Sequence, residues 1–465
     1  MRWDHLIKNG TIVTPRDMYR AHIYVKDGRI SSISEHLLEG EAAMETDAEG
    51  LYVLPGLIDT HVHSRDPGAT HKEDFYHSTQ AAAAGGITTI FEMPNTNPPL
   101  DSKANFESQV KNLQAKAFVN FGLWGICLGK ANLHDLRELD EAGVIGFKYF
   151  WGYAIQRNPF QLVYNHTGDG SDLIPPCHDG EVLEIFEEVA KTGKVLAIHA
   201  ENHELIQTLT ERVRASGRSD YAALVESRPN LAEELTVQTG IALARATGAR
   251  LHILHVSTAE AVDVIAAAQQ AGVQVTAETC PQYLFLTDQD YERIGTAMKI
   301  YPLVKHQQDQ DRIWQGVQDG VIRIVCSDHA PHTEKEKAGD LWSVPAGSCG
   351  VETIVPLMLN EVSRGRLTLQ QMAALLSENP ARQYGLYPRK GALQIGSDAD
   401  LTLVDMNRKV ELRAEQLHSK TKVSAFSGFR VQGFPAATIV GGRLVMKDGQ
   451  IVGDPAGQLV VPDLK

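Results

Sequence analysis

A repeated alternation of short apolar runs with helical patterns restricts the fold of this chain more than any other feature. The apolar runs cover residues 88–93, 144–150, 195–199, 251–256, 273–278 and 322–328. Strand and helix units in alternation indicate a parallel sheet with its helices outside. So many units in one stretch favour a closed, TIM-like (β/α)₈ barrel over an open α/β sheet.

The two ends of the chain have a different pattern, in which short runs alternate apolar and polar residues. Asn9-Gly10 and Asp27-Gly28 near the start, and Asp448-Gly449 near the end, are typical of tight hairpin turns. Both ends therefore indicate antiparallel strands. We expect residues 1–54 and 394–465 to build one composite β-sandwich domain, and residues 55–393 to form the barrel.

Composition and charge argue against several classes of partner. The chain has 465 residues, of which 43% are hydrophobic and 22% charged, so it can form a large core and more than one domain. A formal net charge of -14 offers no basic surface for nucleic acid or an anionic membrane. The chain does not begin like a signal peptide, lacks an apolar run of membrane-spanning length, and has five scattered cysteines. We therefore expect a cytoplasmic protein with reduced thiols.

Polar side chains fall at or near the carboxyl ends of five expected strands. They are His61 and His63, Lys148, His199, His255 and Asp328. The carboxyl ends of barrel strands meet at one mouth, which is where active sites form. A lone histidine at a strand end is more often structural, and a His-x-His pair can be incidental. Five strands with polar ends together indicate a common site.

The chemistry of these side chains suits a metal. Neutral imidazoles and a carboxylate are ligands for zinc or a similar divalent ion, which can keep one position open for water. Lys148 does not fit as an ammonium, because a cation does not bind a cation and its burial is costly. Lys148 is therefore either an ordinary lysine at a strand end or a carbamate, formed with CO₂, that bridges two metal ions.

Five motifs of this chain occur together in one known family. They are Asp59-x-His61-x-His63, Gly146-Phe147-Lys148, Ala197-Ile198-His199-Ala200-Glu201-Asn202, His255-Val256-Ser257 and Ser327-Asp328-His329-Ala330-Pro331-His332. The set resembles the amidohydrolase superfamily, in its cyclic-amide branch of dihydroorotases, allantoinases and hydantoinases or dihydropyrimidinases. The likeness extends over nearly the whole chain, including the split β domain.

The resemblance implies a metal-dependent hydrolase that opens a small cyclic amide or ureide. Two divalent ions, with zinc the expected metal, would be bound by His61 and His63 on one side and by His199 and His255 on the other. Carboxylated Lys148 would bridge them, and Asp328 would complete the first site. A hydroxide that bridges the metals would attack the ring carbonyl, and Asp328 would pass its proton to the leaving nitrogen.

The residues that would contact the substrate point to more than one ring. Arg65, Asn95 and His332 resemble the dihydroorotase positions that hold a substrate carboxylate, which makes dihydroorotase the first choice. Tyr153 instead resembles the hydantoinase tyrosine that stabilises an oxyanion, and Tyr301 replaces an asparagine of the dihydroorotase site. An allantoinase or hydantoinase is therefore the second choice, and a non-catalytic scaffold of the same fold is an alternative of another class.

Three further expectations concern loops and assembly. Backbone amides of the turn over residues 344–353, including Gly350, would bind the edge of the ring. The long segment 157–180 is either a lid over the barrel or a disordered insertion. Relatives are commonly oligomers, so the resemblance implies a homodimer or homotetramer.

Overall fold

An eight-stranded parallel sheet forms the centre of the protein. The computed structural model describes residues 2–163 and 172–463. The sheet runs in the order β16-β15-β14-β13-β9-β8-β7-β6. Its strands are β6 (Leu57–Val62), β7 (Ile87–Glu92), β8 (Asn120–Ile126), β9 (Gly146–Phe150), β13 (Val195–His199), β14 (Arg250–Ile253), β15 (Val275–Thr279) and β16 (Ile324–Val325).

The two ends of this sheet meet, so that the strands enclose a barrel. A parallel bridge joins Val62, at the end of β6, to His329, just after β16. The amide of His63 also donates to the carbonyl of His329 at 2.7 Å. Every residue of β6, β7, β8, β9 and β13 is buried, because helices cover the outer face of the sheet. The expected (β/α)₈ barrel is confirmed.

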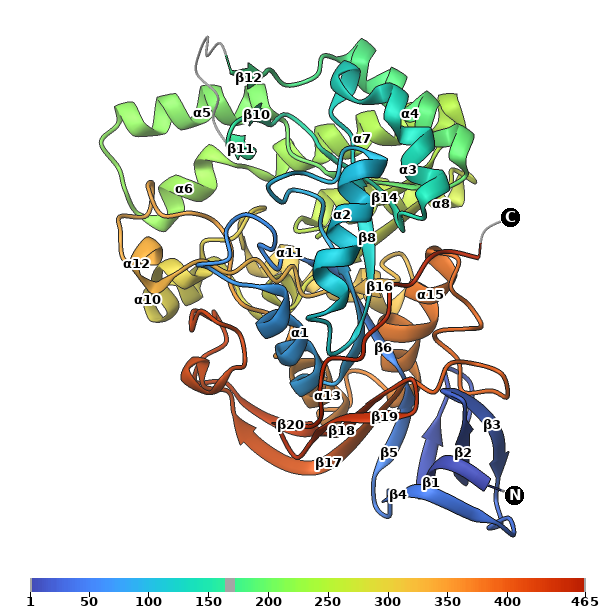
Figure 1. The fold of residues 1–465 in the computed structure, drawn as a ribbon. Helices are drawn as coiled ribbons and strands as arrows, with labels where there is room; N and C mark the ends of the chain where they lie inside the picture. Colours follow the sequence, from blue (N-terminus) through green and yellow to red (C-terminus); the bar gives the residue numbers. More distant parts are fainter. Residues whose placement is uncertain (1, 164–171, 464–465) are drawn as a thin grey trace.

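Helices follow the strands and surround the barrel (Figure 1). The longest is α7 (Asn230–Thr247). The others are α1 (Phe75–Ala84), α2 (Lys103–Gln114), α3 (Leu136–Ala142), α4 (Asp179–Thr192), α5 (His203–Ala215), α6 (Tyr221–Ser227), α8 (Ala259–Gln270), α9 (Pro281–Phe285), α10 (Tyr291–Ile294), α11 (Gln307–Gln318), α12 (Glu334–Lys337), α13 (Ile354–Ser363), α14 (Leu369–Ala373) and α15 (Asn379–Gln383). No helix in the described part of the chain is both long and apolar enough to cross a membrane.

Strands from both ends of the chain form a second sheet, of nine strands, at the base of the view in Figure 1. Its halves join where β5 pairs antiparallel with β17, with Val53 opposite Leu403. Side chains from both halves share one hydrophobic core, which includes Ile12, Ile23 and Ile439. The strands are β1 (Arg2–Val13), β2 (Met18–Lys26), β3 (Arg29–Ser34), β4 (Glu41–Asp47), β5 (Tyr52–Pro55), β17 (Leu401–Glu411), β18 (Arg430–Val440), β19 (Arg443–Lys447) and β20 (Gln450–Ile451).

The last described residues return from this sheet to the barrel. Leu459 forms a parallel bridge with Phe121 of β8, and Val460 is buried in a cluster with Trp124. We propose the domain division 1–54 with 394–465 and 55–393, with the addition that residues 457–460 also pack on the barrel.

The long segment after β9 contains a small sheet of its own. Strands β10 (Ala154–Gln156), β11 (Gln161–Val163) and β12 (Leu173–Ile174) pair antiparallel, with β10 in the middle. Leu162 of β11 is buried in a cluster with Phe150 and Tyr153, near the barrel mouth. The remainder of the expected lid or insertion, residues 164–171, lies outside the described residues.

Candidate active site

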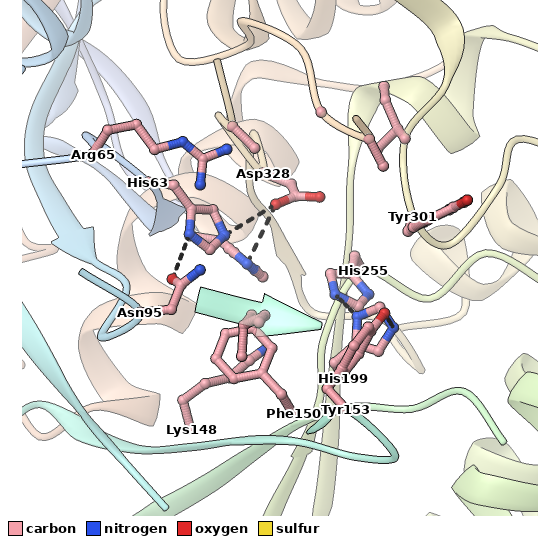
Figure 2. A pocket seen from close by; sticks show the side chains of 16 residues that line it. His63, Arg65, Asn95, Lys148, Phe150, Tyr153, His199, His255, Tyr301 and Asp328 are labelled. Atoms are coloured by element: carbon pink, nitrogen blue, oxygen red, sulfur yellow. Dashed lines mark hydrogen bonds and ion pairs between the residues drawn. The ribbon is translucent and has the colours of Figure 1, made fainter. Parts of the chain in front are cut away.

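A pocket with about 500 Å³ of empty space lies at the carboxyl ends of the barrel strands. Its floor is polar and consists of His61, His63, Lys148, His199, His255 and Asp328. Figure 2 labels all of these except His61. The lining also includes five largely apolar side chains, which together we call the wall: Phe150, Tyr153, Leu162, Ile300 and Tyr301. The strand ends thus bring together all six residues that the sequence suggested as metal ligands.

His61, His63 and Asp328 form one group on this floor. The Nε2 atom of His61 lies 3.3 Å from Asp328 Oδ1, and the Nε2 atom of His63 lies 3.7 Å from the same oxygen. One ligand atom from each residue lies within 4.8 Å of the others, a separation at which all three could hold one metal ion. His61 Nδ1 faces Glu278 Oε1 at 2.9 Å, and His63 Nδ1 faces Asn95 Oδ1 at 2.8 Å. These contacts leave both Nε2 atoms for a metal.

His199 and His255 form a second group. The Nδ1 atom of His199 and the Nε2 atom of His255 face each other at 3.1 Å. The other ring nitrogen of His199 contacts Glu201 Oε2 at 2.9 Å and the Tyr153 hydroxyl at 2.8 Å. The outer contacts fix the ring of His199, so its Nδ1 and the Nε2 of His255 point at the same place.

Lys148 extends from β9 beneath both groups. Its side chain is fully buried, and its amine has no hydrogen-bond partner in the described residues. Burial lowers the pKa of Lys148 to about 7, because a charged ammonium loses its hydration there. A buried amine without a partner is costly. A carbamate on this nitrogen would supply two anionic oxygens to metal ions on the floor, so the position fits the bridging role.

Burial also favours the neutral form of three imidazoles of the floor, those of His63, His199 and His255. It lowers the pKa of His199 to about 4 and lowers the pKa values of His63 and His255 well below their ordinary value. Burial raises the pKa of Asp328. Neutral imidazoles with an adjacent carboxylate are the donor set that zinc and similar ions select. The residues present therefore fit a divalent metal site.

Three residues of the site hold an unusual backbone conformation. Arg65, His255 and Asp328 have φ angles of 62°, 36° and 48°, in the left-handed region that favours glycine. Such conformations cost free energy and occur where the surrounding structure requires them, often at functional sites. The strand ends are thus bent to turn these side chains into the pocket.

The three residues expected to hold a carboxylate lie close together, and all three have partners within the protein. The Oδ1 atom of Asn95 faces His63, as described above, and His332 Nε2 lies 3.0 Å from the carbonyl of Ala346. Arg65 lines the pocket, and its Nε donates to the carbonyl of Pro331 at 3.3 Å. Its Nη2 lies 3.4 Å from His332 Nε2. This arrangement orders Arg65 beside the pocket.

In the turn after β16, Gly350 does not lie where we expected, at the edge of the substrate ring. Gly350 does not line the pocket, and its amide donates to His329 Nδ1 at 3.1 Å. Ala346 and Gly347 line the pocket instead, and the φ of Gly347 is 137°. A Cβ atom at Gly347 would lie 2.2 Å from the carbonyl of Ala330, so only glycine fits at this approach.

Two buried lysines, which the sequence argument overlooked, hold this turn. Lys299 Nζ donates to the carbonyls of Leu341 and Val344 at 2.7 and 2.6 Å. Lys337 Nζ donates to the carbonyls of Lys299 and Pro345 at 3.0 and 2.9 Å. Ammonium groups thus take up carbonyl oxygens that the turn buries. No sequence motif marks these lysines, because their partners are backbone atoms.

Lys337→Met should destabilise the protein more at pH 9 than at pH 6. Burial, and next the charge of Lys299, lower the pKa of Lys337 to about 7. Between pH 7 and the pKa of an unfolded lysine, the unfolded state binds more protons, so this group adds stability as the pH rises. The gap in unfolding free energy between wild type and variant should widen by about 2 kcal/mol from pH 6 to pH 9. Denaturant unfolding at both pH values measures this gap. A gap that does not change with pH contradicts the lowered pKa of Lys337.

The barrel, with a group of possible metal ligands at the carboxyl ends of its strands, has the architecture of barrel enzymes that bind metal ions. The profile of the Amidohydrolase family matches residues 52–445. The chain belongs to the amidohydrolase family, as its motifs predicted.

Relatives from bacteria resemble the chain along its whole length. L-hydantoinase from Paenarthrobacter aurescens is 36% identical over 97% of this chain and 96% of its own. Allantoinase from Deinococcus radiodurans is 37% identical over 99% of both chains. The solved structure of L-hydantoinase (dihydropyrimidinase) from Arthrobacter aurescens superposes with a TM-score of 0.91 at 35% identity, over 99% of this chain and 100% of that one.

These relatives define the reaction class and correct its subtype. The protein is an enzyme, a cyclic amide hydrolase of the hydantoinase and allantoinase type. The second choice from the sequence therefore fits better than the first choice, dihydroorotase. The resemblance at Arg65, Asn95 and His332 favoured dihydroorotase because sequence shows residue types but not their partners.

Proposed function

We propose that the enzyme opens the five-membered ring of a hydantoin that carries a substituent on C5. Allantoin is itself a hydantoin with a ureido group on C5, so the L-hydantoinase and the allantoinase among the relatives are named for the same ring. The observation that carries the proposal is the lining of the pocket, which combines a polar floor of possible metal ligands with the apolar side chains of Phe150, Leu162 and Ile300. A flat polar ring suits the floor, and an uncharged substituent suits the wall.

The residues of the floor divide into those that hold metal and those that handle a proton. We propose that His61 and His63 hold one divalent ion, that His199 and His255 hold another, and that carboxylated Lys148 joins them. Zinc is the proposed metal. When bound, the ions would polarise a ring carbonyl and lower the pKa of the attacking water.

Asp328 is the proposed proton carrier. Its Oδ1 faces His61 and His63, so Oδ2 remains to take a proton from the attacking water. The water oxygen bonds to C4, the C4–N3 bond breaks, and Asp328 returns the proton to N3. The products of this step are a terminal urea and a carboxylic acid, which loses the second proton of the water to solvent and becomes a carboxylate. Because burial raises the pKa of Asp328, the carboxyl can hold the proton between the two transfers.

Tyr153 and Arg65 have proposed roles at the substrate. The Tyr153 hydroxyl lies at the pocket, 2.8 Å from His199 Nε2, where it would donate to the oxygen that becomes negative on C4. Arg65 borders the pocket at the opposite side in Figure 2, beside His63. We propose that Arg65 orders the segment around His332 and binds no substrate carboxylate.

A hydrolysis panel tests the proposed ring and the role of Arg65. The panel contains hydantoin, a C5-alkyl hydantoin, allantoin, dihydrouracil and dihydroorotate, with metal content measured on the same sample. We expect kcat/KM for the best C5-substituted hydantoin to exceed that for dihydroorotate by about a hundredfold. Arg65→Ala should lower turnover of charged and uncharged rings alike. A loss confined to dihydroorotate would overturn the proposal and support a carboxylate site.

A further inference from the structure

A buried ion pair lies behind the pocket, between Glu201 and Arg228. Arg228 Nε donates to Glu201 Oε1 at 3.2 Å, and its Nη2 donates to Oε2 at 2.5 Å. Both residues are only 3% exposed. Arg228 does not line the pocket; it borders a smaller cavity on the far side of Tyr153.

One end of this pair reaches a candidate metal ligand. Glu201 Oε2 accepts from Arg228 and also lies 2.9 Å from His199 Nε2. The carboxylate therefore holds the ring of His199 so that Nδ1 faces His255. Outer carboxylates of this kind set the orientation and basicity of a metal-binding imidazole.

The other end of the pair reaches the wall of the pocket. The guanidinium carbon of Arg228 lies 3.8 Å from the centroid of the Tyr301 ring, within range of a cation–π contact. Tyr301 lines the pocket opposite Arg65 in Figure 2. A single guanidinium thus contacts the support of His199 along its edge and the wall residue Tyr301 on its face.

Backbone hydrogen bonds fix the segments that carry Arg228 and Glu201. Arg228 lies between α6 and α7, and its amide donates to the carbonyl of Val225 at 3.0 Å. The amide of Asn202, next to Glu201, donates to the carbonyl of Ala232 in the first turn of α7 at 2.8 Å. The backbone segments that carry Glu201 and Arg228 are therefore joined, so that the two side chains meet in one geometry.

Stability alone does not explain a pair at this depth. The desolvation of two buried charges offsets most of their attraction, and apolar replacements of such pairs are often neutral or stabilising. The contacts give a more specific reason. We infer that Arg228 is a positioning residue that couples the second histidine group to the substrate wall: through Glu201 it aligns His199, and through its face it sets the position of Tyr301.

Replacing Arg228 with lysine tests this coupling. Lysine keeps the positive charge but has neither the two-pronged edge nor the planar face. We expect Arg228→Lys to lose metal to a chelator about ten to a hundred times more readily than wild type. KM for the best ring of the hydrolysis panel should also rise, because Tyr301 loses its support. Metal retention is read by elemental analysis after dialysis, without any assay of turnover.

Two further variants separate the two arms of the coupling. Glu201→Gln should reduce metal retention, while Tyr301→Leu should raise KM and leave metal retention unchanged. In the Arg228→Lys background, Tyr301→Leu should raise KM by a smaller factor than in wild type, since the two residues act together. Equal factors in both backgrounds would overturn the coupling.

The control is Arg218→Lys. Arg218 lies just before α6, as Arg228 lies just after it, and pairs with Asp220 and Glu226 at an exposed site. This variant should behave as wild type. Normal metal retention and KM in folded Arg228→Lys would refute the inference, with folding checked by circular dichroism. If Arg228→Lys does not fold, normal metal retention in Glu201→Gln refutes it instead. The KM arm rests on the proposed function, whereas metal retention is independent of which ring is cleaved.

Discussion

Asp328→Asn should lower kcat for ring opening by about a thousandfold or more and leave the fold intact. Asparagine has nearly the same volume as aspartate, and Asp328 is buried at the barrel mouth, so the packing should not change. The variant lacks the negative charge that faces His61 and His63 and cannot accept the proton of the attacking water. Initial rates on the best ring of the panel, with metal content and circular dichroism of the same sample, measure the effect.

Asp263→Asn is the matched control for this prediction. Asp263 lies on α8, outside the barrel, and its side chain is 66% exposed in an ion pair with Arg312. Loss of one exposed ion pair costs at most about 1 kcal/mol, so rates and metal content should equal those of wild type. Wild-type turnover in Asp328→Asn would reject the proton transfer that we assign to Asp328.

The barrel was predictable because its strands are buried on both faces. Continuous apolar runs such as residues 195–199 occur as β13 with the expected bounds. The run at 322–328 shortens to β16, Ile324–Val325, and Asp328 follows the strand. Strand β8 had no clear signal, because Gly122 and Gly125 interrupt its apolar pattern. Side chains at those positions would collide with Phe91 and press against Phe147, respectively.

The floor of the site was predictable from the geometry of a barrel. Residues at the carboxyl ends of successive barrel strands must meet, so His61, His199 and Asp328 could be placed together without coordinates. The residues that support the floor and the wall could not be predicted from the sequence. Arg228 and Lys299 act through contacts with residues far away in the chain, and such partners leave no spacing pattern.

The prediction of dihydroorotase as the first choice was not confirmed, because it depended on where single side chains point. Asn95 and His332 have the residue types of a carboxylate site, but in the fold Asn95 Oδ1 faces His63 and His332 Nε2 faces the carbonyl of Ala346. Whether a polar side chain faces a ligand or another part of the protein depends on rotamers and loop positions, which residue spacing does not determine.

Lys148→Met should remove bound metal and lower kcat by about a thousandfold or more. Methionine matches the apolar part of the lysine side chain, which suits the fully buried position of Lys148 on β9, so the fold should persist. The substitution removes the amine, which has no hydrogen-bond partner in the described part of the chain. Elemental analysis and rates on the best ring measure the two losses. Lys130→Met is the matched control, since Lys130 is 67% exposed in a pair with Glu181.

A shorter side chain at the same position tests whether the missing group is a carboxylate. Lys148→Ala leaves space next to Phe150, which the lysine amine approaches to 4.4 Å from the ring centroid. Added acetate or propionate should enter this space and restore part of the metal content and turnover, because a free carboxylate can bridge as a carbamate does. Wild-type protein in ¹³CO₂ should also show a carbamate carbon signal by NMR that Lys148→Met lacks. Full metal content and turnover in Lys148→Met would show that the amine has no part in holding metal.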